Sequence, residues 1–392
     1  MDLELTQHER DFREEVRTWL RENVPKEPRP TDLRGRREYD LAWQRRQYEA
    51  GWAGIAWPVE YGGRGLQLLE QMIWYEEYAR AEAPPLGTCF VGLAHAGPTL
   101  IARGSDEHKR RYLPGILRGE HVWCQGFSEP AAGSDLASLQ TRAIVDGDQL
   151  IVNGQKIWTS YADVADFQEL LVRTDPSAPR HQGISWVICD MRSPGITIRP
   201  IQTATGEADF CEVFYDDVRI PLTNVVGGLN DGWSVAMSTL SFERGTAFMA
   251  DQVELARQVE QLIDAARELP GPRGCGRAID DDEIARGLAR LRAEAAALRA
   301  MTYLAISRIA RSGVPGPESS ILRYYHSLVQ QDFHRLALDV IGPGALIGDR
   351  RNPDGRWSIG YLDSLRATIA AGTKDIQRNI IGERVLGLPR GR

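Results

Sequence analysis

CQGFSEPAAGSDLASLQTRAIVDGDQLIVNGQKIWTS, residues Cys124–Ser160, is the one long segment in which strand patterning, turn signals and a small-residue loop lie close together. Its dipeptides Asp146–Gly147 and Asn153–Gly154 are among the strongest hairpin-turn signals. They bracket Leu150–Val152, which we predict to be a very short strand. The pattern therefore indicates β structure in the middle of the chain.

Four more strand-like runs follow this segment, with no helical pattern between them. They are Leu170–Arg173, Ile184–Asp190, Ile196–Ile201 and Phe210–Ile220. Short strands at this spacing indicate a small antiparallel barrel or sandwich. Because helical spacing returns on both sides, we predict an α+β multidomain protein. Its domains are an N-terminal helical domain (residues 1–120), an antiparallel β-barrel or sandwich domain (121–230) and a C-terminal helical bundle (231–392).

Apolar residues at helical spacing predict helices in both outer domains. In the N-terminal domain they are Leu5–Leu20, Arg37–Glu49, Leu68–Ala81, Gly87–Ile101 and a helix capped by Ser105. In the C-terminal bundle they are Gly232 to about Leu269, Glu283–Ser312, Ser320–Ile341 and two shorter pieces that flank Ala370–Asp375. The segment Gly87–Ile101 is almost entirely apolar, so we expect it to be buried.

Composition and charge exclude several classes of function. The 392 residues carry 47 Lys and Arg against 54 Asp and Glu, a net charge of -7, so no basic surface for nucleic acid is indicated. No apolar run reaches the roughly 20 residues that span a bilayer, and the charged N-terminus is unlike a secretory signal. The five cysteines are scattered singly, which favours neither a zinc site nor a disulfide framework. We therefore expect a protein of the reducing cytoplasm with no bound metal.

Two elements of the Cys124–Ser160 segment could carry chemistry. The loop Ser128–Asp135 combines hydroxyls with small residues such as Gly133, which would let its backbone approach a planar or phosphorylated ligand. An ordinary turn is the alternative, since Gly/Ser/Asp loops are common. The second element, Trp158–Ser160, places a large ring beside two hydroxyls. The alternative there is a tryptophan that only packs in a core.

Three separated motifs give the chain a family resemblance. SEPAAGSD, NGQKIWTS and the C-terminal AAGTKDIQRNIIGERVLGLPR together resemble the acyl-CoA dehydrogenase family, in order and over essentially the whole chain. The resemblance implies an N-terminal helical domain, a middle β domain and a C-terminal four-helix bundle. It also implies FAD between the β domain and the bundle, a homo- or heterotetramer, an acyl-CoA substrate and an electron-transfer flavoprotein as electron acceptor.

The resemblance also implies roles for individual residues. Those expected to hold FAD are Gln125, Phe127, Ser128, Ser134, Trp158, Thr159, Ser160, Gly342 and Thr373. Those expected near the substrate are Ser134, Arg244 and the backbone N–H of Ala371. In the family reaction a carboxylate removes the α-proton of the thioester while the β-hydrogen leaves as hydride to flavin N5. The product is a 2,3-enoyl-CoA.

The base is where this chain departs from most of the family. Family members usually carry Glu directly before the Gly-Thr of the C-terminal motif, and this chain has Ala371 there. A minority resembling isovaleryl- and long-chain dehydrogenases places Glu before an arginine on the first long bundle helix, where this chain has Glu243 and Arg244. Ala236, Leu240, Glu243 and Ala247 share one helical face, so Glu243 has apolar neighbours. The alternative is that Glu243 forms a structural ion pair with an arginine.

Two further departures resemble one branch of the family. The Arg-x-Phe-Gly segment is not clear in Pro272–Arg277, and the Gln-x-x-Gly-Gly segment becomes Asp339–Pro343, with Gly342 retained. These changes resemble a bacterial branch that is linked to steroid side-chain and other bulky acyl-CoA substrates and is in part heteromeric. A non-catalytic partner subunit, and a flavin oxidase or monooxygenase on the same fold, are the competing readings.

Overall fold

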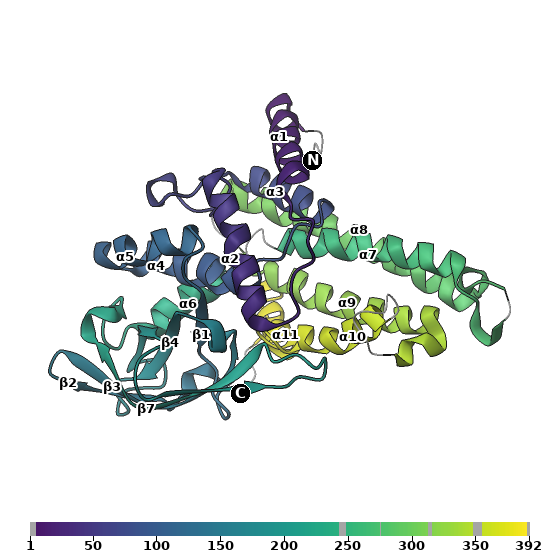
Figure 1. Cartoon of the computed structure of the whole chain (residues 1–392). Coiled ribbons are helices and arrows are strands. Elements are labelled where there is room, and N and C mark those ends of the chain that lie inside the picture. The colour runs from purple at the N-terminus through teal and green to yellow at the C-terminus, as the bar shows by residue number, and fades with distance from the viewer. Residues whose placement is uncertain (1–4, 243–247, 275, 313–315, 348–354, 390–392) are drawn as a thin grey trace. The chain divides into compact units, whose positions relative to one another are not determined.

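The computed structural model describes residues 5–242, 248–274, 276–312, 316–347 and 355–389 (Figure 1). Its residues form two compact units. The sheet unit comprises residues 18–67 and 82–243, and the helical unit combines residues 1–17, 68–81 and 244–392. The helical unit therefore gathers segments from both ends of the chain.

Eight strands form one sheet in the sheet unit. Their order is β6-β7-β3-β2-β4-β5-β8, and β1 pairs in parallel with β4. The strands are β1 (Trp123–Gly126), β2 (Arg142–Asp146), β3 (Gln149–Ser160), β4 (Phe167–Arg173), β5 (Ile184–Asp190), β6 (Ile196–Ile201), β7 (Phe210–Pro221) and β8 (Val225–Val226). The predicted helix–sheet–helix order is confirmed, and most strand pairs are antiparallel as expected.

The prediction of a very short strand at Leu150–Val152 was wrong. A turn between β2 and β3 does occur at the first dipeptide, with Gly147 at a φ of +62°. It consists of Gly147 and Asp148, because Asp146 is still paired with Gln149. Asn153–Gly154, however, lies inside the 12-residue strand β3, where the register with β7 shifts. A Cβ at Gly154 would lie 2.6 Å from the Thr141 hydroxyl, so glycine is required there by a close approach of the chain rather than by a turn.

The central strands β4 and β5 are buried on both faces of the sheet. Alternate residues of β4 and β5 point to opposite faces, so Leu171 and Trp186 join one core while Leu170 and Val187 join another. The first core lies between the sheet and the helices of the same unit. Those helices are α2 (Leu33–Glu49), α4 (Gly97–Arg103), α5 (Asp106–Leu117) and α6 (Gly232–Phe242). This double burial explains why β4 and β5 lack an exposed polar face, although Gln168 and Glu169 of β4 are polar and buried.

The predicted helix at Gly87–Ile101 is buried in large part but is not one regular helix. It consists of a 3-10 turn (Gly87–Cys89), a π turn (Gly92–Ala96) and then α4. A Cβ at Gly97 would lie 2.0 Å from the ring of Trp57, so the tryptophan packs directly on the backbone at this point. Ser105 caps α5 as predicted, and its hydroxyl accepts a hydrogen bond from the N–H of His108.

The helical unit contains the long C-terminal helices, and α7 and α8 run side by side in it (Figure 1). Its helices are α3 (Leu68–Arg80), α7 (Phe248–Glu268), α8 (Asp282–Ser312), α9 (Ser319–Ile341), α10 (Gly355–Ser364) and α11 (Lys374–Ile380). The first turns of α1 (Gln7–Asn23) belong to it as well. The helix predicted from Gly232 to about Leu269 is described as α6 and α7, because residues 243–247 lie outside the described residues.

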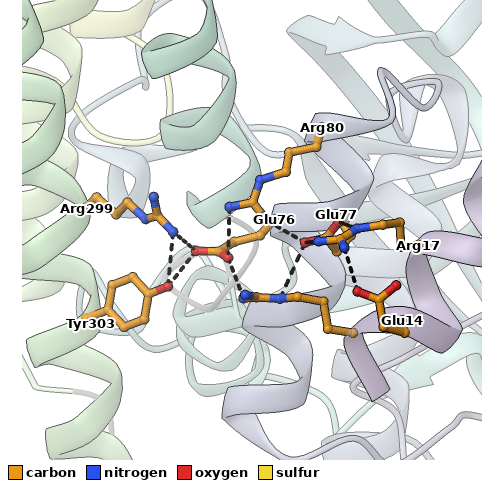
Figure 2. Close-up of polar contacts among 8 residues, drawn as sticks. Glu14, Arg17, Glu76, Glu77, Arg80, Arg299 and Tyr303 are labelled. Atoms are coloured by element: carbon orange, nitrogen blue, oxygen red, sulfur yellow. Dashed lines mark hydrogen bonds and ion pairs between the residues drawn. The ribbon is translucent and has the colours of Figure 1, made fainter. Parts of the chain in front are cut away.

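Two adjacent glutamates of α3 join α1 and α8 to it (Figure 2). Glu76 accepts a hydrogen bond of 3.0 Å from Arg13 of α1. The same carboxylate accepts bonds from Arg299 at 2.7 Å and Tyr303 at 2.6 Å, both in α8. Glu76 and Glu77 are buried, and buried acids are tolerated where cations and donors surround them. The network therefore fixes the place of α3 within the helical unit.

Candidate functional site

A bulge in β3 brings Trp158 to the surface of the sheet unit. Lys156 pairs with Val213 of β7 and Thr159 pairs with Cys211, so β3 has one extra residue between these two pairs. At this insertion Trp158 has a strained, left-handed backbone with a φ of +61°, and its side chain is 57% exposed. Without the extra residue, strand alternation would direct position 158 to the same buried side as Lys156. The bulge therefore presents a large aromatic ring outward.

A buried ion pair fastens the small-residue loop to this strand. The ammonium of Lys156, which is fully buried, donates to Glu129 at 2.8 Å and to the Phe127 carbonyl at 3.0 Å. The Glu129 carboxylate also accepts backbone N–H groups of Gln140 (2.7 Å) and Thr141 (2.9 Å). Burial lowers the pKa of Lys156 to about 8. Burial alone would raise the pKa of Glu129, but Lys156 and the hydrogen bonds lower it overall.

The loop Ser128–Asp135 leaves room for a ligand. A Cβ added at Gly133 would meet no atom within 4 Å, so the packing of the chain itself does not demand glycine there. Ser134 is exposed, and the Ser128 carbonyl accepts a 3.0 Å bond from the N–H of Ile157, one residue before Trp158. Loop and bulge therefore meet along one edge. An open backbone, exposed hydroxyls and an exposed ring fit the expected flavin.

Three of the predicted flavin residues have side chains that point into the protein. Phe127 belongs to the core beneath the helices. Thr159 is fully buried, and its hydroxyl has no hydrogen-bond partner within the described part of the chain. Gln125 donates to Glu169 at 2.7 Å and lies 3.2 Å from a ring nitrogen of His95. Of the predicted flavin residues of this unit, Trp158 and Ser134 are exposed, and Gln125, Ser128 and Ser160 are half-buried.

The remaining described candidates lie in the helical unit. Ala371 has a φ of +52° and Gly372 a φ of +87°, so the chain turns sharply before α11. Thr373 is the N-cap of α11, and its hydroxyl accepts from the N–H of Ile376. Gln377 donates to the carbonyls of Ala371 (3.2 Å) and Gly372 (3.4 Å), which holds this turn. Gly342 ends α9 with a φ of +63°.

Two candidates could not be placed. Glu243 and Arg244, the predicted base and its neighbour, lie outside the described residues. Conversely, sequence analysis missed the Lys156–Glu129 pair and the His95–Gln125–Glu169 cluster. A lysine inside a strand, before Ile157 and Trp158, was a usable signal for the first pair. No local sequence feature indicated the second cluster. Among the described residues no group of three or more His, Cys, Asp or Glu could hold a metal ion, and no helix is long and apolar enough to cross a membrane.

Family comparison matches nearly the whole chain. The models of the acyl-CoA dehydrogenase N-terminal, middle and C-terminal domains match residues 6–120, 124–218 and 230–386. Two curated proteins of Mycobacterium tuberculosis are similar over their full length. Acyl-CoA dehydrogenase IpdE1 is 42% identical over 97% of this chain and 98% of its own. Acyl-CoA dehydrogenase FadE26 is 33% identical over 100% of this chain and 99% of its own.

Two solved structures are also similar to this chain over its full length. A protein titled Tcur3481-Tcur3483 steroid ACAD is 31% identical with a TM-score of 0.85, and each chain is covered completely. The ChsE4-ChsE5 complex from Mycobacterium tuberculosis is 32% identical with a TM-score of 0.83, again with complete coverage of both chains.

Proposed function

Because the chain belongs to the acyl-CoA dehydrogenase family, we propose that it removes two hydrogens from a bulky acyl-CoA thioester, with Glu243 as the base. Membership of the family makes it an oxidoreductase with FAD as cofactor. The product would be a 2,3-enoyl thioester. The observation that carries the proposal is an exposed Trp158 on a strained bulge, beside an open small-residue loop, in a chain matched by all three family models.

The bulge and the loop are proposed to hold the cofactor. FAD, when bound, supplies the acceptor for the two electrons of the oxidation. Trp158 offers a flat apolar surface, and Ser128 and Ser134 offer hydroxyls for hydrogen bonds. The Lys156–Glu129 pair keeps the loop beside the bulge, so these groups are arranged before any ligand arrives. Such prearrangement lowers the entropic cost of binding.

Glu243 is proposed as the base because the usual carboxylate is absent near the C-terminus. The methyl group of Ala371 cannot take a proton. The most buried positions of α6 recur at helical spacing, and position 243 follows next in that series. These positions are Gly232, Val235, Ala236 and Thr239. A carboxylate on an apolar face is poorly solvated, which makes it a stronger base. Arg244 is proposed to contact the substrate.

The acyl group is proposed to be bulky, and the active assembly to include an unlike chain of the same fold. Support comes from two solved structures at 31–32% identity, the Tcur3481-Tcur3483 steroid ACAD and the ChsE4-ChsE5 complex. An electron-transfer flavoprotein is proposed as the physiological electron acceptor. A non-catalytic partner subunit is the second candidate function. The retained loop and bulge weigh against it, since a chain without flavin of its own has no use for a strained Trp158.

Replacing Glu243 by Gln tests the base. We expect Glu243→Gln to keep FAD but to reduce bleaching of the flavin by a reactive acyl-CoA by about 10²–10⁴-fold, the usual contribution of a general base. Glu268→Gln, at the exposed end of α7, is the matched control and should retain the wild-type rate.

The measurement is stopped-flow absorbance with straight, branched and steroidal thioesters, followed by turnover with an artificial electron acceptor. A near wild-type bleaching rate in Glu243→Gln would refute the assignment. Purified chain that is colourless alone, and yellow only with an unlike partner, would favour the partner-subunit reading.

A further inference from the structure

The strained strand end around Trp158 is held by the beginning of β7. Trp158 and Tyr161 both have a φ of +61°, and such backbone persists where neighbouring structure enforces it. The N–H of Tyr161 donates to the Asp209 carbonyl at 2.7 Å. Ser160 pairs with Phe210, whose ring lies edge-on to that of Trp158 with 6.1 Å between the ring centroids. The position of Asp209 and Phe210 therefore sets that of Trp158.

Asp209 is itself fixed from another part of the chain. The guanidinium of Arg36, in α2, donates to the two carboxylate oxygens of Asp209 at 3.0 and 3.2 Å. A second nitrogen of the same group donates to Glu207 at 2.6 Å, and its Nε donates to the Pro30 carbonyl at 3.2 Å. Arg36 is buried, with 7% of its surface exposed, and it is 173 residues from Asp209 in the sequence. Charged hydrogen bonds in such a setting are strong and directional.

Arg36 is also held rigidly on its own side. It lies in the first turn of α2, where Asp32 caps the helix by accepting the N–H of Gly35 at 2.8 Å. One turn later, Asp40 accepts two bonds of 2.7 Å from Arg29, which anchors the chain just before the helix. The guanidinium therefore projects from a fixed helix end onto the start of β7.

We propose that Arg36 is a positioning residue for the flavin wall: through Asp209 and Glu207 it holds the start of β7, and β7 holds Trp158 in its outward, left-handed conformation. The inference rests on the proposed FAD site but concerns a residue that would not touch FAD. It gives a helix of the N-terminal part of the chain an indirect role in shaping the cofactor surface.

The test compares Arg36→Met with Arg36→Lys and with Arg45→Met, an exposed arginine of the same helix. Each apoprotein is titrated with FAD, the visible circular dichroism of the bound flavin is recorded, and thermal unfolding of the apoprotein is measured. We expect Arg36→Met to weaken FAD binding about tenfold or more, which corresponds to 1.4 kcal/mol, and to change the flavin dichroism. Arg36→Lys should lie between it and wild type, and Arg45→Met should match wild type.

A second background separates positioning from general stabilisation. Glycine tolerates a positive φ, so in Trp158→Gly the backbone at position 158 can keep its conformation without support from β7. Arg36→Met should therefore have little further effect on FAD affinity in Trp158→Gly, although it still lowers the unfolding temperature. Equal loss of affinity in both backgrounds, or wild-type affinity and dichroism in Arg36→Met, would overturn the inference.

If Arg36→Met does not fold, Asp209→Asn removes the ion pair without changing size and must show the same pattern. If the wild-type chain binds FAD and these variants bind it equally well, that result contradicts only the role of Arg36. Wild-type chain that binds no FAD, alone or with a partner, overturns the proposed function and this inference with it.

Discussion

Trp158 combines two features that a residue selected for stability would lack. Its left-handed backbone costs an L-residue about 1–2 kcal/mol. Its ring is more than half exposed, so burial of apolar surface recovers little of that cost. Ala371, at a φ of +52°, is strained in the same way. Strain at exposed or loop positions is consistent with ligand contact rather than packing. The strained backbone at Trp158 and Ala371 therefore lowers the stability of the protein at the candidate site.

The Lys156–Glu129 pair supplies a prediction at the same scale. Lys156→Met leaves the Glu129 carboxylate buried without its cation, which should lower the free energy of unfolding by about 3–5 kcal/mol. The double variant Lys156→Met/Glu129→Gln removes both charges and should recover part of this loss. Urea denaturation at pH 7 measures both. A single variant as stable as wild type would show that the pair does not stabilise the loop.

The same pair predicts how the free energy of unfolding of the wild type, relative to that of the double variant, depends on pH. Because the pKa of Glu129 is lowered by folding, its contribution is present above its unfolded pKa and is lost as the pH falls through the folded value. Folding lowers the pKa of Lys156 from 10.5 to about 8, so the unfolded chain binds more protons between these values. Relative to the double variant, the wild type should therefore become less stable in acid and more stable as the pH rises from 8 to 10.5.

In the helical unit, ion pairs join elements in addition to apolar packing, which already places Met72 of α3 against Met249 of α7 and Ile306 of α8. Glu76 and Glu77 are adjacent on α3, and arginines reach them from three helices. The acids are buried while the arginines are partly exposed, which keeps each charge either paired or hydrated. This arrangement explains why α3 and the start of α1 belong with the C-terminal helices, although the family model for the N-terminal domain spans residues 6–120.

Glu76→Gln tests this network. Removing one buried charge leaves several cations competing for a neutral amide, so we expect a loss of about 3–5 kcal/mol in unfolding free energy. Glu14→Gln is the matched control, because Glu14 also pairs with an arginine of α1 but is largely exposed. Its loss should stay within about 1 kcal/mol. Equal effects of the two variants in chemical denaturation would argue against a special role for Glu76.

At the scale of the molecule, large apolar side chains are exposed in the helical unit. Among the described residues of the helical unit, several large ones are exposed near the C-terminal end, namely Leu346, Ile347, Leu362, Leu365 and Ile369. Exposed apolar patches mark interaction surfaces. Tetramers are typical of this family, and these side chains are suited to such contacts.

Changing two of these residues tests the assembly. Leu365→Glu/Ile369→Glu should shift the mass measured by light scattering toward the 43.8 kDa of one chain, because buried charges without partners destabilise an interface. Arg45→Glu, at an exposed charged position of α2, is the control and should leave the mass unchanged. An unchanged mass in the first variant would place the assembly surface elsewhere.

The sequence by itself determined the order of elements and the family, whereas the residues expected to hold FAD stay predictions. Periodicity and turn residues are local properties, so the bounds of β5, β6 and α9 could be predicted within one residue. The domain bounds at 120 and 230 and the role of Glu243 stay predictions. The two Gly-containing dipeptides looked alike in the sequence, yet only the first lies at a turn, which consists of Gly147 and Asp148.

Only the tertiary structure decided the rest, because it depends on which distant segments meet. Gly154 serves a close approach to Thr141, and Trp158 points outward because β7 opposes a bulge in β3. Thr159 is turned into the core by the same bulge. Arg36 contacts Asp209 across 173 residues. Local propensity carries no information on such contacts, since their free energy arises only when the whole chain brings the partners together.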